Sequence, residues 1–383
     1  MKKVLSIILA LSFLFTIGAS AADTTAAAAQ PQALELKAKS AILVEASTGK
    51  VLFEKNSHER LAPASITKIM TMILIMEALD SGRIKLTDLV TCSEYAAGMG
   101  GSQVYLEAGE EMSVSDLLKA IAVASGNDAS VAIAEFIAGS NTAFIAMMNQ
   151  KAKDLKMNDT NFINCTGLEE ENHYTSAYDV ALMSCELLKH PKVLEYTSIW
   201  LDSLRGGKFG LANTNKLVRF YKGANGLKTG STDKALYCVS ASAVRNNMSL
   251  VSVALASPTS ANRFSDASKI LDYGFANWAI ANTDNEEIIE PVKVIKGVMP
   301  SVGVQVSGDT HIVVEKGKEQ LVKKSINMQE DVLAPVDKGQ TLGDIVYTLD
   351  GNEVGRVPIK AVDSVAKAGF GYFLQKLAKV LYA

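Results

Sequence analysis

The sequence predicts an α+β fold: a large domain in which strands from both ends share one antiparallel sheet, followed by a small all-β domain. Three observations predict it. A pair of strand-like runs opens the chain, and long apolar helical segments follow. Two further strands and a helix close the first domain, and short β-prone runs punctuated by Gly, Asn and Asp come after them. Strands and helices in separate runs are typical of α+β proteins.

The N-terminus has the pattern that predicts an export signal. Two lysines precede an apolar run at residues 4–17, and an A-x-A sequence follows at residues 19–21. The run is short for a membrane span, so we predict a signal peptide over residues 1–21, with an uncleaved anchor as the alternative. Residues 22–36 are of low complexity and predict a flexible leader.

The composition limits the possible partners. The formal net charge is −3, and removal of the signal peptide, with two lysines and no acid, makes the chain more acidic. Because no basic cluster is present, we predict no nucleic-acid partner. Hydrophobic residues make up 48% of the chain, which is ample for a packed core.

The cysteines and histidines indicate neither a disulfide framework nor a metal site. The cysteines lie far apart with no C-x-x-C pair, and we interpret them as small buried residues, although export would permit a disulfide. The histidines have no metal-ligand spacing, so we predict no metal and no cofactor. These residues are Cys92, Cys165, Cys185, Cys238, His58, His173, His190 and His311.

The first domain is predicted over residues 37–282. Two β-prone runs around a Thr-Gly turn at residues 48–49 predict a hairpin. Residues 65–79 are apolar almost all the way round, as in a helix buried inside a domain. Further helices are predicted over residues 113–138 and 175–189. Two strands joined by a polar turn and a helix over residues 262–278 complete the domain.

The rest of the chain predicts two further parts. A polar linker at residues 283–287 leads to residues 290–361, whose short strands predict a small β-sandwich-like domain. Residues 363–383 predict an amphipathic helix, since at 100° per residue one face is apolar and the opposite face carries lysines. This pattern favours a helix lying on a membrane surface, with Lys367 reaching the interface; docking on the protein's own β domain is the alternative. The apolar face comprises Phe370, Phe373, Leu374, Leu377, Val380 and Leu381.

The first chemical motif is the S-x-x-K sequence at residues 65–68. Residues i and i+3 share one helix face, so Ser65 and Lys68 project to the same place. The predicted helix N-terminus favours developing negative charge at Ser65. A serine needs a base, and a lysine in a buried helix loses hydration, which lowers its pKa. S-x-x-K also begins at Ser47 and Ser364, outside buried helices, and we interpret both as accidental.

Two further motifs are uninformative when taken singly. S-G-N at residues 125–127 lies between two apolar helical segments. An ordinary inter-helix turn is the alternative to a role in the site. K-T-G at residues 228–230 occurs once and precedes an apolar strand. Its lysine and hydroxyl would lie at a sheet edge, where Gly230 leaves room for a substrate backbone. A solvated turn is the alternative.

Together, the ordered motifs resemble the S-x-x-K, S-D-N and K-T-G signature of class A β-lactamases and penicillin-binding proteins, with Gly126 in place of aspartate. LAPASITKIMT, VASGNDASVAIAE, NCTGLEEENHYTSAYDVA and NTNKLVRFYKGANGLKTGST extend the resemblance across residues 38–280. They are similar to the D-alanyl-D-alanine carboxypeptidases, the low-molecular-mass penicillin-binding proteins. The resemblance implies a β-lactamase/transpeptidase-like domain with a helical subdomain, a small β domain and an amphipathic tail.

The resemblance also implies roles for the motif residues. Ser65 would attack the penultimate D-alanine carbonyl of a peptidoglycan stem peptide, with Lys68 as base and Ser125 passing a proton to the leaving amine. Water would then hydrolyse the acyl-enzyme. Backbone N–H groups of Ser65 and Ser231 would form the oxyanion hole; that family often has histidine at position 231.

The implied substrate-binding residues have separate tasks. Asn127 would bind the substrate amide, and Thr229 the terminal carboxylate. The charge of Lys228 would help to keep the neighbouring lysine neutral. Arg263 would steer the carboxylate, with a solvated charge at a helix start as the alternative. The full set is Asn127, Lys228, Thr229, Gly230, Ser231 and Arg263.

The implied function is removal of the terminal D-alanine from peptidoglycan at the outer face of the cytoplasmic membrane, with β-lactams as inhibitors. The alternatives are a β-lactamase, a D,D-endopeptidase and a catalytically silent penicillin-binding sensor. Class A β-lactamases place a glutamate four residues before an asparagine, and Asn172 has none there. The long continuation after Gly230 also disfavours a lone β-lactamase domain, and the intact motif side chains disfavour a silent sensor.

Overall fold

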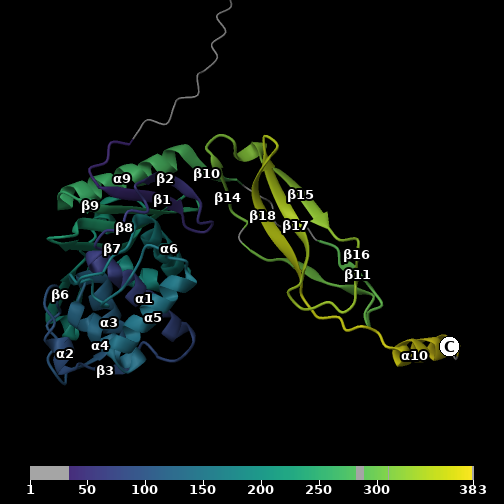
Figure 1. The fold of residues 1–383 in the computed structure, drawn as a ribbon, viewed down its shortest axis with the longest axis horizontal. Helices are drawn as coiled ribbons and strands as arrows, with labels where there is room; N and C mark the ends of the chain where they lie inside the picture. The colour runs from purple at the N-terminus through teal and green to yellow at the C-terminus, as the bar shows by residue number, and fades with distance from the viewer. Residues whose placement is uncertain (1–33, 282–288, 309, 382–383) are drawn as a thin grey trace, which may run out of the picture. The chain divides into compact units, whose positions relative to one another are not determined.

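The computed structural model describes residues 34–281, 289–308 and 310–381 (Figure 1). The predicted signal peptide, most of the predicted leader and the predicted linker at residues 283–287 lie outside the described residues. Leu36–Ala383 forms one unit, and the domain boundary near residue 282 stays a prediction.

The first sheet contains five antiparallel strands in the order β2-β1-β9-β8-β7. Strand β1 (Ser40–Glu45) pairs with β2 (Val51–Lys55) on one side and with β9 (Met248–Ser257) on the other. This arrangement confirms the predicted hairpin and the sheet shared between distant parts of the chain. Strands β8 (Leu236–Arg245) and β7 (Ala224–Thr232) follow, and β7 forms the edge.

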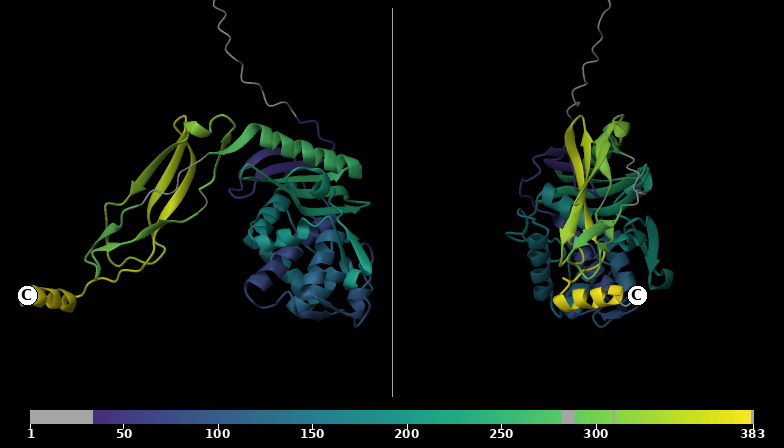
Figure 2. Two further views of the ribbon diagram at one scale, coloured as in Figure 1. Left: turned by 180° about the vertical axis from the view of Figure 1, so that it is seen from behind. Right: turned by 90° about the vertical axis from the view of Figure 1, so that its right-hand side faces the viewer.

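Helices cover both faces of this sheet because its strands send apolar side chains to both. Val251 and Val253 of β9 belong to the main core, whereas Ala254 packs with Ala267 of helix α9 (Ser260–Asn277). Helix α9 runs along one face (Figures 1 and 2). On the opposite face lie α1 (Lys68–Asp80), α3 (Val114–Lys119), α4 (Asn127–Ala138), α5 (Asn141–Asp154) and α6 (Ala177–Leu188). There α6 packs against β1 and β9.

Helix α1 (Lys68–Asp80) passes through the main core. Its residues from Lys68 to Met76 are all buried, as the apolar pattern predicted. Full burial of each Ile, Leu or Met contributes about 1.5–3 kcal/mol to stability. A 3₁₀ turn, η1 (Ala64–Thr67), precedes it, so the α-helix begins at Lys68 rather than at Ser65.

The predicted helix over residues 113–138 is divided into α3 (Val114–Lys119), a π-helical segment η2 (Ala120–Ala124) and α4 (Asn127–Ala138). Within the described ranges no single helix is long and apolar enough to cross a membrane, and one pair, α4 with α5 (Asn141–Asp154), bent by 86°, meets that test by length and composition. The remaining elements of this region are β3 (Leu89–Thr91), α2 (Glu94–Ala97), β4 (Glu111–Ser113), η3 (Pro191–Val193), α7 (Leu194–Thr197), β5 (Leu201–Leu204), η4 (Arg205–Gly207), β6 (Phe209–Ala212), α8 (Leu217–Phe220) and β10 (Trp278–Ala281).

The segment after residue 289 consists mainly of strands, which confirms the predicted small all-β domain. One sheet has the order β12-β11-β16, a second has the order β13-β18-β17-β15, and β14 pairs with β10. The elements are β11 (Val292–Ile295), β12 (Ser301–Val302), β13 (Val304–Val306), β14 (Ile312–Glu315), η5 (Glu319–Leu321), β15 (Lys323–Met328), β16 (Asp331–Leu333), β17 (Thr341–Leu349) and β18 (Asn352–Ala361).

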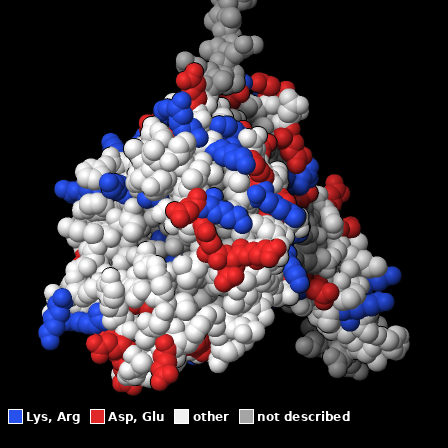
Figure 3. Space-filling model, turned by 60° about the vertical axis from the view of Figure 1, so that its left-hand side comes forward, with Lys and Arg blue, Asp and Glu red and all other residues white. Residues whose placement is uncertain are grey.

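The distribution of surface charge and the burial of the cysteines can be compared with the expectations from the composition. On the face drawn in Figure 3, basic and acidic side chains are interspersed. Cys92, Cys165 and Cys238 are buried in the first region and Cys185 is half-buried, and all four are free thiols. The interpretation of the cysteines as small buried residues is therefore confirmed for the first three.

Helix α10 (Phe370–Leu381) lies at the end of the described chain. Phe370, Leu374, Leu377 and Leu381 are all exposed, and they recur at a spacing that places them on one helix face. Its Tyr372 donates a hydrogen bond from its hydroxyl to the carbonyl of Val298 at 2.7 Å. The role of this helix stays a prediction.

Candidate active site

Ser65 and Lys68 lie together as their spacing predicted, although the local geometry differs. Ser65 belongs to the 3₁₀ turn η1, in which residues i and i+3 eclipse each other. Lys68 Nζ therefore lies 3.0 Å from Ser65 Oγ. Ser65 is partly exposed, whereas Lys68 is completely buried. The hydroxyl is accessible from outside while the amine is shielded from water.

The surroundings of Lys68 are suited to a neutral amine. Besides Ser65, Nζ contacts the Asn127 side-chain carbonyl oxygen and the backbone carbonyl of Thr166, each at 2.6 Å. Burial lowers the pKa of Lys68 to about 7, and the nearby Cys165 and Asp128 partly oppose this shift. A neutral amine has two N–H donors, which the two carbonyls accept. Its lone pair then faces the hydroxyl of Ser65.

The S-G-N residues form one wall of the site. Asn127 is buried at the start of α4, and its side-chain N–H donates to the carbonyl of Gly100 at 2.7 Å, which fixes the amide orientation. Ser125 has a left-handed backbone, with φ 64°. Among the described residues, its buried hydroxyl has no hydrogen-bond partner, so it is available to a bound molecule.

The K-T-G residues lie within β7, the edge strand that directly precedes the apolar strand β8, so their predicted place at a sheet edge is confirmed. The alternative of a solvated turn is wrong, since Lys228 is 1% exposed. Burial lowers the pKa of Lys228 well below its usual range, and the charges of Lys68 and Arg263 act in the same direction. Two buried lysines that repel each other do not readily both carry a proton.

Gly230 brings strand β7 directly against the nucleophile. A Cβ on Gly230 would lie 2.7 Å from the backbone nitrogen of Ser65, so no larger residue fits without a shift. Ser231, the next residue, is exposed. Arg263 is buried rather than solvated, which rules out that alternative, and its Nη1 donates to the carbonyls of Gly230 and Cys238. Arg263 thus braces β7, and its steering of a carboxylate stays a prediction.

Sequence reasoning missed the residues that act through their backbone or through local contacts. Thr166 contributes only its carbonyl oxygen, which leaves no side-chain signal. The hydroxyl of Thr229 donates to that of Thr214 at 2.7 Å, and Thr214 follows β6 directly in a polar N-T-N run. The buried Asp128 accepts from the backbone of Val104 and Leu106, which holds the loop beside Asn127.

Gly167 packs against the backbone of the residue that precedes the nucleophile. Its φ is +86°, and a Cβ there would lie 1.8 Å from the carbonyl oxygen of Ala64, the residue before Ser65.

Gly167→Ala should lower catalytic activity by about tenfold or more, because relief of this clash displaces the Ser65 backbone. Rates and melting temperature should be measured beside Gly82→Ala, which has a similar φ of +71° and nothing within 4 Å. Gly82→Ala should keep full activity. Equal losses in both variants would show that backbone strain alone, rather than the contact with Ala64, is responsible.

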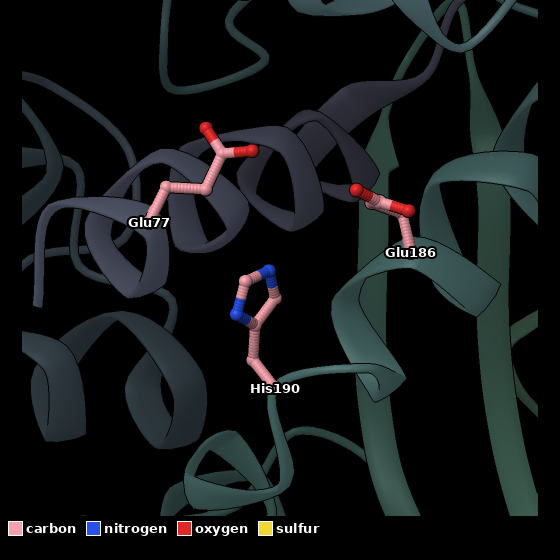
Figure 4. Close-up of side chains that lie close together, drawn as sticks. All are labelled: Glu77, Glu186 and His190. Atoms are coloured by element: carbon pink, nitrogen blue, oxygen red, sulfur yellow. The ribbon is translucent and has the colours of Figure 1, made fainter. Parts of the chain in front are cut away.

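Outside this site, one histidine gathers with acidic residues, which its sequence spacing did not reveal. Ligand atoms of Glu77, Glu186 and His190 all lie within 4.8 Å of one another (Figure 4). Lys151 Nζ lies 2.6 Å from Glu77 and 2.8 Å from Glu186, and Lys189 Nζ lies 2.8 Å from Glu186, so two ammonium groups already pair with the two carboxylates. We interpret the cluster as an ion-pair network that joins α1, α5 and α6.

Comparisons with known proteins agree with this geometry. The model of the D-alanyl-D-alanine carboxypeptidase family matches residues 24–259, and that of the penicillin-binding protein 5 C-terminal domain matches residues 283–367. The carboxypeptidase DacF of Bacillus subtilis (strain 168) is 46% identical over 381 residues, which cover 98% of each chain.

Solved structures give the same result. Penicillin-binding protein 5 of Haemophilus influenzae matches with a TM-score of 0.77 and 32% identity, covering 88% of this chain and 99% of that one. Penicillin-binding protein D2 of Listeria monocytogenes, in its ampicillin-bound form, matches with a TM-score of 0.56 and 31% identity, covering 64% of this chain and all (100%) of that one. Family model, full-length relative and structural neighbours therefore agree that this chain is a member of the D-alanyl-D-alanine carboxypeptidase family, peptidase family S11.

Proposed function

We propose that this protein is a serine D-Ala-D-Ala carboxypeptidase that removes the terminal D-alanine from peptidoglycan stem peptides. The observation that carries the proposal is the contact of 3.0 Å between Ser65 Oγ and a buried amine, Lys68 Nζ, in a chain of this family. An activated serine is what acyl transfer requires. The family supplies the substrate class, and the pair of side chains supplies the chemistry.

In the proposed mechanism, neutral Lys68 takes the proton of Ser65 as its oxygen attacks the carbonyl of the penultimate D-alanine. The new C–O bond gives a tetrahedral oxyanion, held by the backbone N–H groups of Ser65 and Ser231. Collapse breaks the amide bond and leaves an ester on Ser65. The hydroxyl of Ser125 passes a proton to the departing D-alanine amine and receives in its place the proton that Lys68 took from Ser65, so both side chains return to their neutral form. Water then hydrolyses the ester and restores Ser65.

The remaining motif residues hold the substrate. Thr229 lies on the edge strand, and its hydroxyl donates to that of Thr214, so a carboxylate there would accept from the hydroxyl of Thr214, and from that of Thr229 once it turns away from Thr214. Asn127 holds Lys68 through its oxygen and Gly100 through one N–H, and its second N–H is the group that would donate to the substrate amide. Gly230 leaves space for that backbone along β7.

β-Lactams should acylate the same serine, since they resemble the D-Ala-D-Ala end. The ampicillin-bound Listeria relative supports this expectation. A β-lactamase or a D,D-endopeptidase uses the same nucleophile and differs in deacylation or substrate, and a silent sensor would bind penicillin without turnover.

The test is to incubate the purified protein with a pentapeptide ending in D-Ala-D-Ala and to measure free D-alanine, in parallel with penicillin labelling and penicillin hydrolysis. D-alanine release with stable penicillin labelling supports the carboxypeptidase. Rapid penicillin hydrolysis supports a β-lactamase, and labelling without release supports the sensor. Cleavage of cross-linked peptides in preference to pentapeptide supports an endopeptidase.

We also propose that the protein is exported and held at the outer face of the membrane by α10. The apolar side chains of Phe370, Leu374, Leu377 and Leu381 are exposed, whereas docking of this face on the β domain would bury them. Exposed apolar side chains at this spacing favour insertion into a membrane interface.

Deletion of residues 363–383 should move the protein from the membrane to the soluble fraction, because it removes the apolar face that supports binding. Fractionation followed by penicillin labelling measures this, and Ser364→Ala is the control, since it keeps the apolar face and Lys367. D-alanine release in solution should stay within about twofold, because the tail lies outside the site. An unchanged distribution of the truncated chain would exclude the anchor.

A further inference from the structure

The residue before the nucleophile has a backbone conformation that needs support. Ala64 has φ 48°, in the left-handed region that residues with a Cβ seldom adopt. Its peptide leads directly into Ser65, so its orientation sets the direction of the nucleophile. Such conformations persist where surrounding contacts hold them.

A chain of hydrogen bonds reaches this peptide. Thr67 Oγ1 lies 2.9 Å from the carbonyl oxygen of Ala64 and 2.9 Å from His173 Nε2. The backbone N–H of Ile163 donates to His173 Nδ1 at 3.1 Å. Because Nδ1 accepts, the proton of the neutral ring is on Nε2, which donates to Thr67. The hydroxyl proton of Thr67 is then directed to Ala64.

Burial fixes this arrangement. His173 is 5% exposed and Thr67 is completely buried. Burial lowers the pKa of His173 to about 4, so the ring is neutral at pH 7. The ring of Phe162 packs edge-on against it, with centroids 5.9 Å apart. Water therefore does not readily replace any member of the chain.

We propose that His173 is a positioning residue for the Ser65 nucleophile, acting through the hydroxyl of Thr67 on the carbonyl of Ala64. The segment that carries His173 also supplies the Thr166 carbonyl that contacts Lys68. One loop thus orients both the backbone of the nucleophile and its base. This inference rests on the proposed function, since it assigns a part of the same acylation step.

Thr67→Val keeps the shape of the side chain and removes the hydroxyl. The rate of Ser65 acylation by penicillin, and kcat for D-alanine release, should fall by about tenfold or more, since misplacement by 1 Å can cost about 10² in rate. KM should stay within about twofold, because no substrate-binding group is changed. Thr67→Ser, which restores the hydroxyl, should recover most of the rate.

His173 variants test the other end of the chain. His173→Leu should match Thr67→Val, and the double variant should be no slower than the slower single variant, because both break one chain. His173→Gln retains an N–H donor and should be faster than His173→Leu. These rescue and additivity patterns are not expected from a merely structural histidine.

Thr197→Val is the matched control. Thr197 is also completely buried, and its hydroxyl donates to the carbonyl of Asn225 at 2.8 Å. It should keep the normal acylation rate at a comparable change in melting temperature. Normal acylation of Thr67→Val, or an equal loss in Thr197→Val, would overturn the inference. If Thr67→Val does not fold, equal rates for His173→Gln and His173→Leu would overturn it. A wild-type protein that neither binds penicillin nor releases D-alanine would contradict the proposed function instead.

Discussion

Ser65→Ala should abolish D-alanine release, with a fall in kcat of about 10⁴-fold or more, the order seen when a serine hydrolase loses its nucleophile. It should also prevent covalent labelling by penicillin, because the ester forms on the Ser65 oxygen. The measurements are free D-alanine from a pentapeptide ending in D-Ala-D-Ala and intact mass after penicillin treatment. The fold should survive, since Ser65 is partly exposed and its loss creates little cavity.

The chain provides two matched controls. Ser47 and Ser364 also begin S-x-x-K sequences. The hydroxyl of Ser47 donates to Glu45, and that of Ser364 accepts from the backbone of Lys338, so both serve local turns. Ser47→Ala and Ser364→Ala should retain labelling and turnover. Normal release by Ser65→Ala would end the assignment of the nucleophile.

Lys68→Met should lower the acylation rate by about 10²- to 10⁴-fold, the usual contribution of a general base. The wild-type rate should also depend on pH with a defined sign. Burial places the pKa of Lys68 at about 7, and only the neutral amine can accept the Ser65 proton. Acylation should therefore rise as pH increases through about 7, and fall about tenfold per unit well below it.

This is measured as the rate of penicillin acylation between about pH 5 and pH 9, with the folded state followed by circular dichroism. Lys367→Met is the control, since Lys367 is the exposed lysine of another S-x-x-K sequence. It should show the wild-type profile. A flat wild-type profile, or normal acylation by Lys68→Met, would contradict the role of Lys68 as base.

The sequence was sufficient to predict the helices and strands whose structure follows from a local pattern of residues. The apolar run after Ser65 predicted a buried helix, and two runs joined by a polar turn predicted strands β8 and β9. The boundaries were less accurate. The turn before α1 is 3₁₀ and begins at the left-handed Ala64. K-T-G lies inside β7, because polar residues can occupy an edge strand that faces a site. Neither outcome has a local sequence signature.

The site was predicted in its side chains and not in its backbone. Lys68 contacts Ser65, as the S-x-x-K spacing implied. It also contacts Asn127, for which the sequence implied only binding of the substrate amide. The carbonyl of Thr166 and the close approach of Gly167 depend on a loop whose path follows from tertiary packing. Arg263 was predicted either to steer a carboxylate or to be solvated, and its burial against β7 and β8 depends on the sheet, which no local pattern specifies.

The sheet order has a consequence for how the chain acquires its structure during synthesis. Strand β1 lies between β2 and β9, and Ser40 pairs with Leu255. A growing chain therefore displays β1 with one edge unpaired until most of the first region has left the ribosome. The pairing of β1 with β9 closes a loop of about 200 residues, from Glu45 to Met248, and this closure is entropically costly. Pairings between residues so far apart in the sequence also form slowly. The first sheet is therefore incomplete during most of synthesis. Unpaired strand edges in such a state are prone to aggregation, and chaperones bind chains of this kind.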